Sequence, residues 1–477
     1  MSKKVEHFDV VIIGAGFSGS MVAINLAREA PGLRVLIADN DRAFGRGVAY
    51  STNTIQHLLN VPAGKMSAFP DDPDHFAKWL AVRRHVLLNA GIEAISPGDF
   101  VPRKIYGTYI RQLLEKARRA TGNLEFLRCQ VSDTEPWGDL LHLTAENGAG
   151  FTARRVVLAL GNFPPGDPHV RDSSFHRSPR YLSDPWSQQT LRRISRNDDI
   201  LILGSGLTAL DLLVNLAGIK SRGTIHVISR RGHFPQPHAS YEPQPGWFAD
   251  CIFPTTIRAL LRLVRTEVMK AGENGIDWRA IIDALRPHNQ GIWQSLPLPE
   301  RRRFMRHLRA LWESHRHRAA PDVLSVKDAM IGRSQLLLHR GSVRGIVDIN
   351  PGLEVTFFDR ATLRERTLRV AYAVNCTGPE CNYQKLKSPL VINLLARGLI
   401  RPDPMYIGLD TAPGGPVIDY LHAPSANIYT LGSTAKGRLF ETTAVPELRV
   451  QARDLAIRIC KDLSSATEGD PVHQYHI

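Results

Sequence analysis

Two glycine-rich turns carry the strongest chemical signal in the sequence. The first, Gly14-Ala15-Gly16-Phe17-Ser18-Gly19, is a complete G-x-G-x-x-G between an apolar run, residues 8–13, and a segment of helical spacing, residues 20–29. In this pattern the first glycine makes the tight turn, the second lets the backbone approach a pyrophosphate, and the third lets helix and strand pack closely. Asp39 ends the next apolar run, where a carboxylate accepts hydrogen bonds from a ribose. We predict a dinucleotide site formed by Gly14, Gly16, Ser18, Gly19 and Asp39.

The second turn is Gly204-Ser205-Gly206-Leu207-Thr208-Ala209, in which alanine takes the third position, as the same fingerprint allows. It follows an apolar run, and the next apolar run ends in Ser229-Arg230-Arg231, where the first unit has its acid. A guanidinium there binds a 2′-phosphate, so NADPH is favoured over NADH. The alternative is that the arginines face solvent at a strand end. The predicted contacts are Gly204, Gly206, Ala209, Ser229, Arg230 and Arg231.

Two such units in one chain predict a bound flavin that a nicotinamide reduces. The unit with Asp39 suits the adenosine of FAD, and the unit with the arginines suits NADPH. The expected cofactors are therefore FAD and NADPH, and the expected fold is α/β, with two Rossmann-like domains and a helical insertion. We expect an FAD-binding domain in two segments, residues 1–195 and 334–477, around an NAD(P)H-binding domain, residues 196–333, whose insertion covers about 240–320.

The amino-acid composition is that of a globular protein, and it limits the classes of partner that we expect. With 477 residues, 43% hydrophobic and 22% charged, the chain is long enough for two or three domains. No apolar run reaches the roughly 18 residues of a membrane span, and no signal-peptide pattern precedes the first strand, so we expect a cytoplasmic protein without a membrane partner. The net charge of +14 is spread along the chain and no nucleic-acid-binding motif occurs, so nucleic acid is not expected. A homo-oligomer is compatible with the sequence.

Several further blocks resemble a family of bacterial FAD/NAD(P)-binding flavoproteins. That family includes FAD-dependent urate hydroxylase-like proteins and is related to the flavin monooxygenases with two dinucleotide-binding domains. The matching residues are 45–50, 57–72, 101–103, Tyr106-Gly107, 184–186, 204–211, 229–232, Trp312, 315–318 and 441–447. The resemblance implies an FAD-binding fold with an inserted NADPH domain, and oxygenation as the activity. The Phe-x-Gly-x-x-x-His signature of flavin-containing and Baeyer-Villiger monooxygenases is absent, because Phe163 to His169 has a different spacing.

The predicted activity is hydroxylation of a small polar nucleophile with molecular oxygen, through a flavin C4a-hydroperoxide. N-hydroxylation and ring hydroxylation of a purine-like compound are the leading chemistries. The block after the first unit would supply the residues nearest the flavin ring. Asn60, Lys65 and His57 are the catalytic candidates, although a solvent-facing lysine and a hydrogen-bonded structural histidine are the competing interpretations. Further cofactor contacts are predicted at Pro62, Met66, Gly161, Gly378, Gly432, Ser433 and Thr443.

Other classes fit the sequence less well. Cys376 and Cys381 have the C-x4-C spacing of a redox pair, but they follow a late strand, so Cys376 is interpreted as a small buried residue. No metal is expected, because His315 and His317 point to different faces of a helix. A flavin-dependent reductase or dehydrogenase that does not insert oxygen stays open as the main alternative, since the same two nucleotide sites serve it. A non-catalytic redox sensor is the least favoured class.

Overall fold

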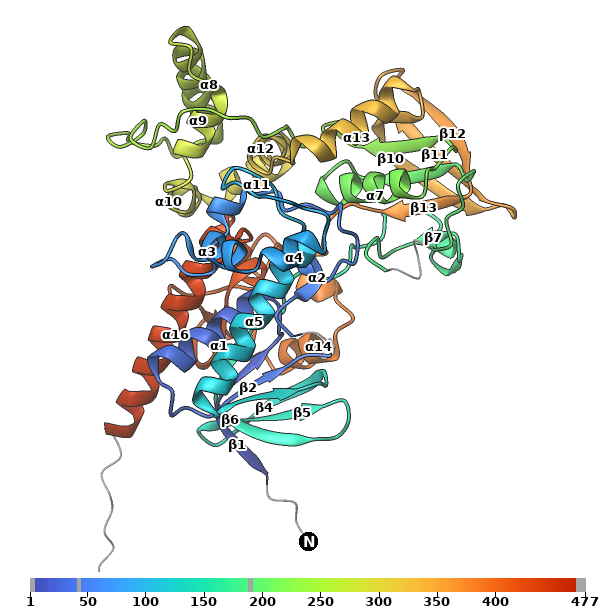
Figure 1. Cartoon of the computed structure of the whole chain (residues 1–477). Helices are drawn as coiled ribbons and strands as arrows, with labels where there is room; N and C mark the ends of the chain where they lie inside the picture. The colour runs from blue at the N-terminus through green and yellow to red at the C-terminus, as the bar shows by residue number, and fades with distance from the viewer. Residues whose placement is uncertain (1–4, 41–43, 188–191, 469–477) are drawn as a thin grey trace, which may run out of the picture. The chain divides into compact units, whose positions relative to one another are not determined.

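The structure, a computed structural model, describes residues 5–40, 44–187 and 192–468 (Figure 1). Its contacts divide the chain into two compact units. The first consists of Met1–Asn53, Pro62–Asn162 and Cys381–Ile477. The second consists of Thr54–Val61 and Phe163–Glu380. Each unit contains one sheet together with helices, which is the α/β class expected from the sequence.

The first unit is built on a sheet in the order β14-β15-β6-β1-β2-β3. Its central strands are parallel and apolar on both faces, as in a sheet covered on each side. The pair β4 and β5 extends the sheet as an antiparallel hairpin against β6. The strands are β1 (Glu6–Ile13), β2 (Val35–Ala38), β3 (Leu124–Leu127), β4 (Val131–Trp137), β5 (Leu140–Ala145), β6 (Gly150–Leu158), β14 (Pro416–Ile418) and β15 (Pro424–Thr430).

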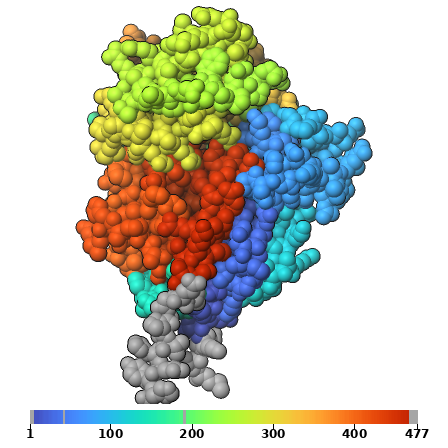
Figure 2. All heavy atoms as spheres, turned by 90° about the vertical axis from the view of Figure 1, so that its left-hand side faces the viewer, coloured from blue at the N-terminus to red at the C-terminus, as the bar shows by residue number. Residues whose placement is uncertain are grey.

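Three long helices lie together in this unit, with α1 in contact with both α5 and α16 (Figure 1). Along the face shown in Figure 2, the surface of α16, in red, adjoins that of the N-terminal segment, in blue. The helices are α1 (Phe17–Glu29), α2 (Gly47–Tyr50), η1 (Ala63–Lys65), α3 (His75–Val82), α4 (Arg84–Leu88), α5 (Arg103–Thr121), η3 (Tyr383–Lys385), α14 (Pro389–Ala396), η4 (Gly432–Ala435), α15 (Lys436–Leu439) and α16 (Val445–Glu468). Helix α5 ends because Gly122 takes a left-handed conformation, at φ +69°.

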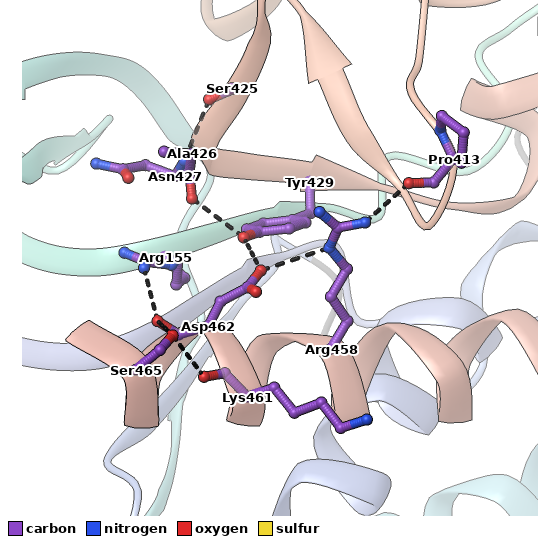
Figure 3. A network of polar contacts seen from close by, with 10 residues as sticks. All are labelled: Arg155, Pro413, Ser425, Ala426, Asn427, Tyr429, Arg458, Lys461, Asp462 and Ser465. Carbon is purple, nitrogen blue, oxygen red and sulfur yellow. Dashed lines mark hydrogen bonds and ion pairs between the residues drawn. The ribbon is translucent and has the colours of Figure 1, made fainter. Parts of the chain in front are cut away.

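A polar network fixes α16 to the last strand of the sheet (Figure 3). The Tyr429 hydroxyl, on β15, donates to Asp462 Oδ2 at 2.7 Å, and burial together with this carboxylate raises the pKa of Tyr429 to about 12. Arg155, on β6, donates to the Asp462 carbonyl at 3.2 Å, while Arg458 donates from α16 to the Pro413 carbonyl at 2.9 Å. The network thus holds together the strand and the helix on either side of the turn at Gly432.

The second unit has a seven-stranded sheet in the order β12-β11-β10-β9-β8-β13-β7. Strands β7, β13, β8, β9 and β10 run parallel, and β11 and β12 continue from β10 as antiparallel neighbours. A core of buried side chains that includes Leu201, Ile346 and Phe357 joins the two parts. The strands are β7 (Tyr181–Leu182), β8 (Ile200–Leu203), β9 (Ile225–Ser229), β10 (Leu336–Asp348), β11 (Leu353–Asp359), β12 (Arg364–Val370) and β13 (Tyr372–Asn375).

The compact units differ from the domain boundaries that we expected at residues 195/196 and 333/334. Residues 334–380 fall in the second unit because β10 pairs with β9, and β13 pairs with β8. Residues 163–195 fall there too, since β7 adds to β13. Pairing between strands far apart in sequence decides these boundaries, and single-strand patterns do not reveal it.

The predicted helical insertion lies between β9 and β10 (Figure 1). It has a small core of its own, in which Phe248, Ile281 and Leu285 are buried and Trp312 packs against them. Helix α13 leaves this core and lies against α7 (Figure 1). The helices of the second unit are η2 (Ser174–Arg177), α7 (Leu207–Gly218), α8 (Ile257–Glu273), α9 (Trp278–Ala284), α10 (Asn289–Ser295), α11 (Leu298–His307), α12 (Arg309–Arg316) and α13 (Pro321–Gly332).

Candidate functional sites: two dinucleotide turns

The first glycine turn connects β1 to α1, as the sequence predicts. Gly14 has φ +107°, and a Cβ there would lie 2.3 Å from the Ala159 carbonyl oxygen. A Cβ on Gly19 would lie 1.9 Å from the Gly14 carbonyl oxygen, so helix and turn are too close for any side chain. The surrounding backbone therefore leaves no room for a side chain at either glycine.

Gly16 is different, because the protein leaves room beside it. Its backbone, at φ −70° and ψ −169°, suits any residue, and the nearest atom to an added Cβ would be Gly47 Cα at 3.6 Å. Gly16 is the N-cap of α1, and no side chain of the described residues caps this helix end. The first-turn amides of α1 therefore keep the donor groups that bind a pyrophosphate, and Gly16 keeps the approach to them open.

The segment Gly45-Arg46-Gly47 closes over this turn. The Gly45 amide donates to the Ala15 carbonyl at 2.8 Å, and a Cβ on Gly47, at φ +57°, would lie 3.0 Å from Gly16 Cα. In the sequence this segment is notable only through the family resemblance. The structure gives a physical reason for each glycine, since Gly47 packs against the predicted pyrophosphate turn and a Cβ on Gly45, at φ +92°, would lie 2.9 Å from the backbone of Arg111 on α5.

Asp39 lies beside the turn, at the end of β2. Its Oδ2 accepts a hydrogen bond from the Ala15 amide at 2.6 Å, so the carboxylate ties the second strand to the glycine turn. The sequence predicts a ribose contact at this position. A contact with ribose would be a second role for Asp39, besides its hydrogen bond to the Ala15 amide, and it stays a proposal.

The block that follows contains Pro62, Lys65 and Met66, and it is anchored in the first unit. Lys65 is exposed at the end of η1, while Met66 is buried. The next residues are held by long-range polar contacts, since the Ala68 amide donates to the Tyr109 hydroxyl at 3.3 Å and Arg449 donates to the Ser67 carbonyl at 3.0 Å. Helices α5 and α16 thus hold in place a segment that contains little regular secondary structure.

The third part of this site is the turn after β15. Gly432 has φ +74°, and a Cβ there would lie 3.3 Å from Ser18 Oγ, so the structure brings this turn against the first glycine turn. The Ser433 hydroxyl donates to the Gly161 carbonyl at 2.6 Å, which joins two further predicted residues. The predicted residue Thr443 is exposed, at the start of α16.

The Gly432 turn is held by Thr442, which belongs to the family-resemblance block 441–447, and by Gln451, which the sequence did not single out. The Gly432 amide donates to Gln451 Oε1 at 3.1 Å, and the Thr442 hydroxyl donates to the Gly432 carbonyl at 3.3 Å. Gln451 Nε2 in turn lies 2.8 Å from Thr442 Oγ1. Nothing in the local sequence marks a glutamine in the second turn of a helix as a loop anchor, because its partner lies 19 residues earlier.

The second glycine turn connects β8 to α7 in the second unit. Gly204 has φ +99°, and a Cβ there would lie 2.5 Å from the Cys376 carbonyl oxygen. Ala209 is fully buried, which explains why a small residue takes the third position. Gly206 is the exposed N-cap of α7, and within the described chain an added Cβ would meet no atom within 4 Å. As at Gly16, the space beside the second glycine is not filled by the protein.

The three polar residues that were predicted as coenzyme contacts at the end of β9 have different surroundings. Ser229 Oγ lies 2.8 Å from Ser205 Oγ, so it helps to shape the turn. Arg231 Nη2 donates to the Arg306 carbonyl at 3.3 Å, which engages part of its guanidinium. Arg230 is exposed at the strand end. Gly378, at φ +91°, follows the neighbouring strand β13, where a Cβ would meet no described atom within 4 Å.

Replacing Arg230 by glutamine tests the 2′-phosphate assignment. We expect the Kd for NADPH to rise by about 10- to 100-fold, because a charged hydrogen bond contributes roughly 1.5–3 kcal/mol, and the Kd for NADH to stay unchanged. Titration of the FAD-loaded protein with each coenzyme measures both constants. Arg222→Gln, at another exposed arginine of this unit, is the charge-matched control. Equal losses for the two coenzymes would contradict the assignment.

The three catalytic candidates are not brought together in one unit. His57 and Asn60 belong to the second unit, whereas Lys65 belongs to the first. His57 is buried, its Nε2 lies 3.2 Å from the Asp211 carbonyl, and its ring packs edge-on against Trp186. This geometry agrees with the interpretation of His57 as a hydrogen-bonded structural residue. The Asn60 carbonyl accepts a hydrogen bond from His238 Nε2 at 2.9 Å.

Cys376 is poorly suited to thiol chemistry. The five cysteines form no disulfide with one another in the described chain. Cys376 is buried after β13, as predicted, and burial, with the charge of Asp211, raises the pKa of its thiol far above the usual range. A thiolate nucleophile is therefore not available there. In the described part of the chain no group of three or more His, Cys, Asp or Glu residues is placed to hold a metal ion, and no helix is long and apolar enough to cross a membrane.

The chain thus consists of two α/β units, each with a glycine turn between a parallel strand and a helix. Residues 11–163 match the model of a family described as FAD-NAD(P)-binding. A comparison with curated protein sequences gives no match. The family match covers the first glycine turn, Asp39 and the block that contains Lys65.

Solved structures with the same fold span nearly the whole chain. An ornithine hydroxylase from Pseudomonas aeruginosa matches with a TM-score of 0.65 and 16% identity, over 96% of this chain and 100% of its own. An ornithine N-hydroxylase from Kutzneria sp. 744, described with reduced FAD, NADP+ and L-ornithine, matches with a TM-score of 0.65 and 14% identity, over 95% and 99%. A thioredoxin reductase from Lactococcus lactis matches with a TM-score of 0.53 and 11% identity, over 96% and 99%. These similarities confirm the predicted fold class.

Proposed function

We propose that this protein is an FAD-dependent, NADPH-using monooxygenase that hydroxylates a small polar nucleophile. The observation that carries the proposal is the pair of glycine turns, one in each compact unit, each with an open space beside its second glycine. Both turns fit a pyrophosphate, because the helix that follows begins without a side-chain cap from the described residues. The family match over residues 11–163 supports FAD at the first turn.

The assignment of the cofactors follows from charge. Asp39, beside the first turn, suits the hydroxyl groups of a ribose, and Arg230, beside the second, suits the additional phosphate of NADPH. The Gly161, Gly432 and Ser433 cluster supplies backbone groups next to Ser18, within reach of the same bound molecule. When bound, reduced FAD supplies the electrons that activate molecular oxygen. The chain itself holds, orients and shields the reactants.

Within this class, N-hydroxylation of an amine is the favoured reaction. Two of the similar structures are named for hydroxylation of ornithine, which is a small polar amine. Ring hydroxylation of a purine-like compound is the second candidate, from the family resemblance of the sequence. A reductase that inserts no oxygen is the alternative class. The similarity in fold to a thioredoxin reductase is compatible with this alternative.

The test uses the full-length protein loaded with FAD. NADPH and oxygen consumption are measured with ornithine, lysine, aliphatic diamines and uric acid, together with the hydroxylated product and hydrogen peroxide. We expect one class of substrate to stimulate NADPH oxidation and to yield hydroxylated product that carries label from isotopically labelled oxygen gas. Product formation should match NADPH use. Rapid NADPH oxidation that gives hydrogen peroxide alone with every compound would favour the reductase alternative.

A further inference from the structure

A third arginine, besides Arg230 and Arg231, lies at the end of the parallel part of the second sheet. Strand β10 runs parallel to β9, and their register pairs Arg340 with Ser229. Residues paired in this way carry their side chains on the same face of a sheet. The Ser229 hydroxyl lies 2.8 Å from Ser205 Oγ, in the second glycine turn. The side chain of Arg340 therefore starts on the face that makes contact with this turn.

The turn after β9 packs against the stem of the Arg340 side chain. A Cβ added to Gly232, at φ +68°, would lie 3.5 Å from Arg340 Cβ and 3.7 Å from its Cγ. The backbone of Arg340 is fixed as well, since its carbonyl accepts a hydrogen bond from the Arg360 amide at 2.8 Å. Arg340 thus enters solvent from a defined position, directly beside residues 229–232, which contain the predicted coenzyme contacts.

The guanidinium of Arg340 is available for a ligand. It is exposed, and in the described chain no carboxylate forms an ion pair with it. The carboxylate of Asp359, on the neighbouring strand β11, is paired with Arg366 at 3.2 Å. Arg230 is exposed too, and Arg231 uses only part of its guanidinium. Because like charges at the ends of adjacent strands repel one another, an anion that contacts more than one of them binds favourably.

The order of the strands indicates which part of a coenzyme would meet Arg340. Strand β8 leads into the glycine turn, β9 lies next to it, and β10 lies on the far side of β9. In this type of unit the pyrophosphate binds at the turn after the first strand, and the adenosine ribose lies at the end of the second. Neighbouring strands are about 4.8 Å apart, which is within the length of an arginine side chain. A phosphate on the ribose, at β9, is therefore within reach of an arginine at the end of β10.

We propose that Arg340 is a second specificity-determining residue of the coenzyme site, and that its guanidinium binds the 2′-phosphate of NADPH together with Arg230. This inference rests on the proposed function, because it takes NADPH as the coenzyme of the second unit. A phosphate has three acceptor oxygens and close to two negative charges, so it accommodates two guanidinium groups. The competing role for an exposed arginine at this position is stacking on the adenine ring, which NADPH and NADH share.

Binding of NADP+ and NAD+ to the full-length, FAD-loaded protein tests this role without turnover. Calorimetry gives the Kd of each coenzyme for the unchanged protein and for Arg340→Gln. We expect the Kd of NADP+ to rise by about tenfold or more, and the Kd of NAD+ to change by less than about twofold. Arg344→Gln, at an exposed arginine further along β10, removes the same charge and should leave both constants unchanged.

The two coenzymes separate the phosphate contact from its competitors. Equal losses for NADP+ and NAD+ in Arg340→Gln would overturn the proposal in favour of adenine stacking. Unchanged constants for both coenzymes would overturn it as well, and would leave Arg230 to bind the phosphate without Arg340. Should Arg340→Gln fail to fold, as judged by its thermal midpoint, Arg340→Lys takes its place. Lysine keeps the charge but has fewer donors, so we expect a smaller loss, about threefold and again for NADP+ alone.

Failure of the proposed function would give a different result. If the unchanged protein binds NAD+ as tightly as NADP+, the assignment of NADPH and the role of Arg340 are both wrong. If the unchanged protein prefers NADP+ and Arg340→Gln keeps that preference in full, NADPH remains the coenzyme and only the inference about Arg340 is lost. Both results come from binding constants, so they do not depend on whether a hydroxylated product is found.

Discussion

Replacing Gly16 by alanine is expected to leave the first compact unit folded and to weaken FAD binding by about 100-fold, or roughly 2.7 kcal/mol. The backbone at Gly16 suits alanine, and the added Cβ would make only an ordinary contact, 3.6 Å from Gly47 Cα. The same Cβ would occupy the space through which a pyrophosphate reaches the amides of α1. The flavin absorbance per protein after purification and the Kd for added FAD measure the effect.

The matched control for this variant is Gly32→Ala. Gly32 is exposed, and within the described chain a Cβ there would meet no atom within 4 Å. It should bind FAD as the unchanged protein does. If Gly16→Ala retains full FAD content while its thermal midpoint is unchanged, the first turn does not hold the flavin pyrophosphate. A variant that loses FAD only because it unfolds would show itself in the far-ultraviolet circular dichroism.

Replacing Gly206 by valine is expected to weaken NADPH binding strongly, so that reduction needs far more NADPH, while FAD stays bound. The side chain would extend into open space beside the N-terminus of α7, so the fold has no reason to change, but the coenzyme pyrophosphate needs the same space. We expect the Kd for NADPH to rise by about 100-fold or more. Anaerobic bleaching of the flavin at increasing NADPH concentrations gives this constant, and reduction by dithionite confirms that the flavin is intact.

Gly246→Val provides the control within the same unit, because Gly246 is exposed and its Cβ would also meet no described atom within 4 Å. It should be reduced by NADPH at the normal rate. Comparison of Gly16→Ala with Gly206→Val assigns FAD and NADPH to their turns independently. Loss of FAD from Gly206→Val, or normal NADPH reduction in it, would each contradict the assignment of the coenzyme to the second unit.

The sequence by itself determined the two glycine turns and the α/β class. Each turn is a local structure, in which an apolar strand, glycines at fixed spacing and an amphipathic helix follow one another within about thirty residues. Gly14 and Gly204 have positive φ angles, and Gly19 packs against the Gly14 carbonyl, so these requirements are local and could be read from the sequence, although contacts with Ala159 and Cys376 add to them. The helical insertion was predictable for the same reason, since its composition and spacing are local properties.

Tertiary structure decided the features that join distant segments. The assignment of β10 and β13 to the second sheet depends on pairing with β9 and β8, which single strands do not specify. Gln451 serves the Gly432 turn, and Arg340 lies beside Ser229, only because the fold brings their elements together. Local sequence determines backbone conformation, whereas burial and hydrogen-bond partners depend on contacts across the chain, so the turns could be predicted and their supporting residues could not.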